Sequence, residues 1–100
     1  MGSILYQKIA MTAKILSQTS NAILRLKDSK IKCIITTKVT PSSLGESVTF
    51  TLHLLEDNTT TVHSYSVILQ YRYLTVNNDA YLDTELSKVT EQIIQTIYAI

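Results

Sequence analysis

Glycine, proline and cysteine are scarce in this sequence, whose 100 residues include two Gly, one Pro and one Cys. Because loops usually carry Gly and Pro at their turns, most of the chain is expected to lie in helices and strands. Two glycines cannot form a glycine-rich phosphate loop, and no CxxC, HExxH or EF-hand motif occurs. These absences argue against the nucleotide-loop and zinc classes, and we expect no cofactor, no metal and no enzymatic activity.

Long apolar runs and paired cysteines are also missing. A membrane span needs about 18 consecutive apolar residues, and no stretch of this sequence approaches that length. Lys8 and Lys14 interrupt the apolar positions near the N-terminus, so no signal peptide is expected. A small secreted domain would usually carry several disulfides, which Cys33 alone cannot form. We therefore expect an intracellular, cytoplasmic protein that makes no contact with a membrane.

The composition that remains is that of one small globular domain. Apolar residues make up 45% of the chain and charged residues 17%, which suits a packed core and argues against disorder. A chain of this length forms one domain, here residues 1–100. The Ile- and Tyr-rich, Gly-poor composition is typical of AT-rich genomes, including those of viruses and mobile elements.

Charge is divided unevenly along the chain. Residues 1–40 hold seven basic residues against a single acid, Asp28, whereas residues 41–100 hold two basic residues against seven acids. A polyanionic partner for the basic part is one interpretation. Complementary surfaces that meet within the fold or between subunits are the other, and the simpler, interpretation.

Residues 3–28 have the periodicity of one long amphipathic helix with two apolar faces. The first face holds Leu5, Ile9, Ala13, Leu16 and Ile23, and the second holds Ile4, Met11, Ile15, Ala22 and Leu26. Together these faces exceed the stripe that a surface helix of a monomer usually shows. We expect a sheet to cover one face, and a second helix or another protein to cover the other.

The middle of the chain alternates with the period of β-strands. Strands are predicted over residues 31–40, 47–55 and about 60–74, with a loop at Pro41–Gly45 and a turn at Glu56–Thr59. A four-residue hairpin loop would place Phe50 opposite Val67, Leu52 opposite Tyr65 and Val48 opposite Leu69. A three-residue loop would place Phe50 opposite Ser66, which is a poorer match, so we favour the first register.

A second helix is predicted to begin at Asn77, Asn78 or Asp79, where side chains suited to capping stand beside an acid. It has a narrow apolar seam at Leu82, Leu86, Val89, Ile93, Ile97 and Ile100. The seam would pack on a sheet or on one other helix, and it also permits a short coiled coil. The order helix, three-stranded antiparallel meander, helix (α-β-β-β-α) predicts a two-layer α+β sandwich.

The residues that could carry chemistry are the two histidines, the single cysteine and the acids that begin the second predicted helix. On the favoured register His53 and His63 lie on opposite faces of the sheet, so they cannot share a metal site. Cys33 lies in an apolar strand pattern, which indicates a buried structural thiol. Asp79 and Asp83 lie one turn apart at the start of a helix, where the helix dipole is sufficient to explain acidic residues.

A basic cluster at the helix-to-strand junction is the best lead for nucleic-acid binding. It comprises Arg25, Lys27, Lys30, Lys32 and Lys38, and clustered Lys and Arg are sufficient for phosphate contacts. Tyr65, Tyr71 and Tyr73, together with Arg72, could stack bases on a sheet. Core packing explains Tyr65 and Tyr71 equally well, whereas Tyr73 is expected near an exposed strand end.

The sequence supports two functional hypotheses. The favoured hypothesis is a non-enzymatic interaction or assembly protein, either a small accessory subunit or a homo-oligomer. Its expected partner interface is Ile4, Met11, Ile15, Leu26, Leu82, Leu86 and Ile93. The alternative is a small nucleic-acid-binding module that uses Arg25, Lys27, Lys30, Lys32, Lys38 and Tyr73.

Overall fold

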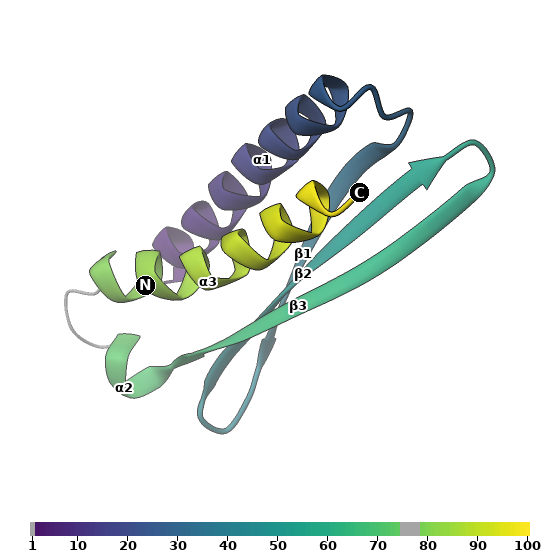
Figure 1. Ribbon diagram of the computed structural model, residues 1–100. Coiled ribbons are helices and arrows are strands. Elements are labelled where there is room, and N and C mark those ends of the chain that lie inside the picture. Colours follow the sequence, from purple (N-terminus) through teal and green to yellow (C-terminus); the bar gives the residue numbers. More distant parts are fainter. Residues whose placement is uncertain (1, 75–78) are drawn as a thin grey trace.

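The computed structural model describes residues 2–74 and 79–100. Its elements follow the order α1 (Gly2–Leu26), β1 (Lys32–Pro41), β2 (Gly45–Glu56), β3 (Thr59–Gln70), α2 (Tyr71–Leu74) and α3 (Asp79–Tyr98). Apart from the short α2, this is the predicted order of one helix, three strands and a C-terminal helix, so the α+β fold class is confirmed (Figure 1). The proposed helix start at Asn77 and Asn78 lies outside the described residues.

The molecule has two layers. The three strands form one antiparallel sheet in the order β1-β2-β3. α1 packs over β1, α3 packs over β3, and the two helices run side by side on the same face of the sheet (Figure 1). Among the described elements, none covers the opposite face. The long helix therefore has a sheet on one side and α3 along one flank.

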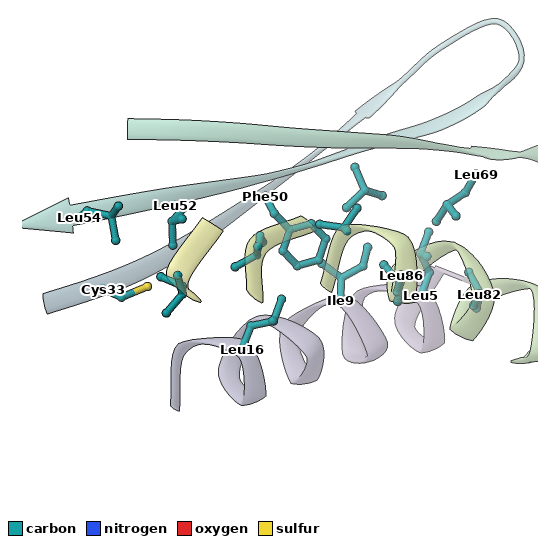
Figure 2. Close-up of a cluster of buried hydrophobic side chains, with 14 of the residues drawn as sticks. Leu5, Ile9, Leu16, Cys33, Phe50, Leu52, Leu54, Leu69, Leu82 and Leu86 are labelled. Atoms are coloured by element: carbon teal, nitrogen blue, oxygen red, sulfur yellow. The ribbon is translucent and has the colours of Figure 1, made fainter. Parts of the chain in front are cut away.

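The core lies between the helices and the central strand. Val48, Phe50 and Leu52 of β2 are fully buried, because alternate residues of the strand point toward the helices. Ile9 and Leu16 of α1 meet them from the other layer, as Figure 2 shows. The seam predicted for the second helix is buried in this core from Leu82 through Ile97.

The favoured register of the second hairpin is wrong by two residues. Phe50 lies opposite Tyr65, rather than Val67, and Val48 lies opposite Val67. The cause is a tighter turn: Glu56 pairs with Thr59, and the two residues between them include Asp57 with φ 53°. Since side chains alternate with period two, a shift of two residues leaves every side chain on its predicted face.

The third strand is also shorter than predicted. β3 ends at Gln70, whose partner Gly45 is the first residue of β2, so the strand has no partner beyond that point. The chain turns into α2 instead, and the Tyr71 N–H donates to the Leu44 carbonyl at 3.0 Å. Tyr71 and Tyr73 therefore do not continue the strand face that carries Tyr65.

The first helix ends at Leu26, two residues before the predicted end. Asp28 adopts φ 56°, and the Ser29 N–H bonds the Leu24 carbonyl at 2.9 Å. The Asp28 N–H bonds the Arg25 carbonyl at 3.0 Å. This pair of bonds is a Schellman motif, which ends the helix and satisfies its last carbonyls. It turns the chain directly into β1.

Candidate protein-interaction surface

One apolar face of α1 remains open in the folded chain. Ile4, Met11, Ile15 and Leu26 are 55%, 63%, 55% and 88% exposed, respectively, and Ala22 beside them is half-buried. We name these five residues the α1 stripe. Their spacings of seven and four residues place them along one side of the helix. The second apolar face predicted for this helix thus exists and has no cover within the described chain.

The opposite face of α1 explains why the stripe is open. Leu5, Ile9 and Leu16 are buried against the other elements of the core. At about 100° per residue, the centre of the stripe lies about 110° around the helix from these residues. A helix that packs on a single layer buries one side. The α1 stripe is therefore the excess apolar surface that the sequence indicated.

The interface residues predicted on the second helix lie elsewhere. Leu82, Leu86 and Ile93 are buried within the single chain, where they pack between the sheet and α1. They stabilise the core and offer nothing to a partner of the folded protein. Of the seven predicted interface residues, the exposed ones are those on α1.

The charges around the α1 stripe are positive. Lys14 and Arg25 are exposed on one flank, and the helix carries no Asp or Glu from Gly2 to Leu26. Lys8, on the other flank, donates from Nζ to Asp83 Oδ1 of α3 at 3.0 Å. That hydrogen bond, aided by the charges of Asp83 and Asp79, raises the pKa of Lys8 above its ordinary 10.5.

The C-terminal end of α3 adjoins the end of α1. Lys27 Nζ donates to the Tyr98 carbonyl at 2.6 Å, and the Tyr98 side chain is 62% exposed. Sequence reasoning missed Tyr98, because it lies off the apolar seam of its helix. An exposed aromatic residue in a last helical turn is the signal that could have found it.

Three of the predicted nucleic-acid contacts gather at the junction between α1 and β1. Arg25, Lys30 and Lys32 line a shallow depression of ≈ 530 Å³. Its other lining residues are Asn21, Ser29, Ile31, Cys33 and Ile34. Lys38 is not among them and lies on β1 opposite Thr49. Lys27 is held by Tyr98, as described above.

The tyrosines do not form a stacking platform on the sheet. Tyr73 lies in α2, where its ring centroid is 5.2 Å from that of Tyr81 and 4.7 Å from the Arg72 guanidinium carbon. Tyr65 bonds the Thr96 hydroxyl from the core face of β3. Tyr73 is thus partly exposed but is separated from the basic junction by the length of β3 (Figure 1).

The histidines and the cysteine have structural surroundings. His53 lies on the open face of the sheet, with Nε2 3.0 Å from Thr36 Oγ1, whereas His63 lies on the other face opposite Leu52. Cys33 is buried, and this burial raises the pKa of its thiol. Ser20 beside it acts in the opposite direction, although its hydroxyl has no partner within hydrogen-bond geometry. The folded state therefore disfavours the nucleophilic thiolate.

Two acidic residues of α3, Asp83 and Glu85, are engaged in ion pairs. Asp83 pairs with Lys8, and Glu85 pairs with Lys88 at 2.5 Å. Within residues 2–74 and 79–100, no three His, Cys, Asp or Glu side chains lie close enough to hold a metal ion. None of the described helices is long and apolar enough to cross a membrane. Comparison of the chain with protein-family models, curated proteins and solved structures found no match.

Proposed function

We propose that this protein is a non-enzymatic interaction subunit whose α1 stripe binds an amphipathic helix of a partner protein. The observation that carries the proposal is the exposure of Ile4, Met11, Ile15 and Leu26 along one side of a well-packed helix. Exposed apolar side chains gathered along one side of a helix are typical of protein interaction sites.

The shape of the stripe suits a helix. From Ile4 to Leu26 it runs for about 33 Å at 1.5 Å per residue. The first four members of the stripe have the spacings of d, d, a and a positions of a coiled coil, in which side chains of two helices interlock, and Leu26 follows at the neighbouring e position. A partner helix laid along α1 would cover the whole stripe with its own apolar seam.

Charge favours a different protein over a second copy at this surface. Two α1 helices placed face to face would bring together Lys14 and Arg25 of both copies, with no acidic residue on either helix. Like charges across an interface oppose association. A partner helix with Glu or Asp beside its seam would instead meet these cations with opposite charge.

The direct test uses two synthetic helical peptides of one length, each with Leu at its seam. One peptide carries Glu beside the seam and the other carries Lys. Fluorescence anisotropy of each labelled peptide, titrated with the protein, measures the affinity. We expect the Glu peptide to bind and the Lys peptide to bind more weakly or not at all.

Variants locate the binding on the protein. The double substitution Met11→Ser/Ile15→Ser should weaken binding by more than about tenfold, because two apolar side chains lose their burial. The matched control is Ile34→Ser/Val62→Ser, which removes two exposed apolar side chains from the open face of the sheet. The proposal is contradicted if both double variants lose affinity for the Glu peptide equally, or if neither peptide binds the natural protein.

A second candidate function, nucleic-acid binding, is favoured by the depression that Arg25, Lys30 and Lys32 line together. Binding through these residues would weaken steeply with salt, because phosphate contacts release counterions. Lys30→Glu/Lys32→Glu should abolish anisotropy changes with labelled DNA or RNA. Lys14→Glu/Lys88→Glu, an equal charge change at exposed positions outside the depression and outside the predicted contacts, should preserve them. Binding that survives the first substitution argues against this candidate.

A further inference from the structure

The two edges of the sheet differ in how they are protected. Strand edges usually carry Lys, Pro or a covering element, which prevents pairing with other chains. β1 has Lys32, Lys38 and a terminal Pro41. β3 runs for 12 residues from Thr59 to Gln70 with no charged residue and no proline.

The β1 edge is also covered by a side chain. Asn21 of α1 bonds both the N–H and the carbonyl of Cys33, each at 2.9 Å. The backbone groups of Cys33 therefore point away from β2, into the free side of β1. In an antiparallel strand, the N–H and the carbonyl of one residue point to the same side, and those of the next residue point to the opposite side. The direction at Cys33 therefore fixes the direction of the backbone groups at every residue of the sheet.

The alternation assigns the free backbone groups of β3. Cys33 lies opposite Leu54, so the Leu54 backbone points toward β3 and bonds its partner Thr61. The even-numbered residues of β3 therefore point outward. Gln70 supports the assignment, because its N–H donates to the Tyr81 hydroxyl of α3 at 2.9 Å instead of to β2.

The free edge has defined ends. Tyr81 closes it at Gln70, and the turn closes it before Thr60. Between them, five residues direct their N–H and carbonyl groups outward: Thr60, Val62, Ser64, Ser66 and Ile68. No strand of the described chain pairs with this edge. The hairpin that carries its first half projects beyond the end of α3 (Figure 1), and residues 59–64 are exposed.

We propose that β3 pairs antiparallel with β3 of a second copy, about a two-fold axis near Ser64, the midpoint of the free edge. The two sheets would then join into one continuous sheet, with the helices of both copies on the same face. Main-chain bonds between the edges would supply the affinity, as in other cases of strand addition.

Charge favours a second copy as the occupant of this edge. Because β3 is uncharged throughout, pairing it with itself places no like charges together. An axis at Ser64 sets Val62 beside Ser66 of the other copy, and Ser64 beside its own equivalent. The surface differs in this respect from α1, whose cations favour an acidic partner. The dimer proposed here does not depend on the α1 stripe.

The experiment measures mass by light scattering over a range of protein concentrations, using the whole chain. We expect a dimer for the natural sequence, and monomers for Ser64→Lys and for Ser64→Glu, since each places like charges at the axis. An equimolar mixture of the two variants should restore the dimer. Thr40→Lys, which adds the same charge to an exposed residue of β1, should remain dimeric.

Amide exchange supplies a second readout. In the dimer, the amides of Val62, Ser64 and Ser66 should exchange slowly, and dilution should remove this protection. A natural protein that stays monomeric at every concentration overturns the proposal. Folded Ser64→Lys and Ser64→Glu chains that remain dimeric when separate, or that fail to associate when mixed, also overturn it.

Discussion

The carboxamide of Asn21 in α1 bonds both backbone groups of Cys33 in β1, with Nδ2 donating to the carbonyl and Oδ1 accepting from the N–H. These are the two bonds that a neighbouring strand would make. Nδ2 also donates to the Ser17 carbonyl at 3.0 Å, which fixes the side chain on its own helix. One residue therefore covers the sheet edge and attaches it to the helical layer.

Replacing this residue should destabilise the fold. Asn21→Leu keeps the size of the side chain but leaves the Cys33 N–H and carbonyl without their partner in a partly buried position. We expect the free energy of unfolding to fall by about 1–3 kcal/mol. Chemical denaturation measures it, with Gln18→Leu, at an exposed position of the same helix, as the control. Equal stability of Asn21→Leu and the natural protein would show that water replaces the carboxamide.

Ser20 is expected to behave in the opposite way. Its side chain is fully buried, and its hydroxyl has no partner within hydrogen-bond geometry. Ser20→Ala removes the buried polar group and introduces the best helix former, so we expect stability to increase by about 1 kcal/mol. Thermal unfolding is the measurement, and Ser17→Ala, one turn earlier on α1, measures the propensity effect alone. A loss of stability would indicate that the contact with Cys33 is favourable.

The sequence predicts which side chains are buried in the core better than it predicts which residues lie opposite each other on neighbouring strands. The alternation of Val48, Phe50 and Leu52 places these residues on the buried face whatever the register. The register itself depends on the backbone of a two-residue turn, with Asp57 at positive φ, and hydrophobic pattern does not encode that geometry. The end of β3 depends on where β2 begins, which is a long-range relationship.

The sequence likewise predicts which residues of the candidate surface are apolar, but not whether they are exposed. Helical periodicity identifies the α1 stripe and the α3 seam as apolar, but it does not say which one the sheet covers. The layers decide this, because α3 points its seam into the core while α1 has a second face left over. The sequence shows that Thr59 to Gln70 carries no charge. Only the strand order β1-β2-β3 shows that this uncharged strand lies at an edge of the sheet.

The Lys8–Asp83 pair should make stability depend on alkaline pH. The pKa of Lys8 is raised above 10.5, mainly by its hydrogen bond to Asp83. A group whose pKa is higher in the folded state stabilises the fold below its unfolded pKa. That contribution is lost as pH rises through the folded pKa.

The measurement is the difference in melting temperature between the natural protein and Lys8→Met. The natural protein should melt higher at neutral pH, and the difference should shrink as the pH passes 10.5. Lys14→Met, on an exposed position of α1, should show no such trend. A difference that is constant with pH would mean that Lys8 acts through packing of its stem alone.

Gly45 allows a close backbone approach between β2 and β3. It pairs with Gln70 at the start of β2, and a Cβ at this position would collide with the Leu69 carbonyl. Gly45→Ala must therefore move the end of β3, which also carries the bond from Gln70 to Tyr81. We expect a loss of about 1–3 kcal/mol in the free energy of unfolding, the usual cost of overpacking. Ser43→Ala, in the exposed loop just before, is the control. If Gly45→Ala unfolds at the same denaturant concentration as the control, the strands can separate locally at no cost, and the proposed fixed end of the β3 edge would be wrong.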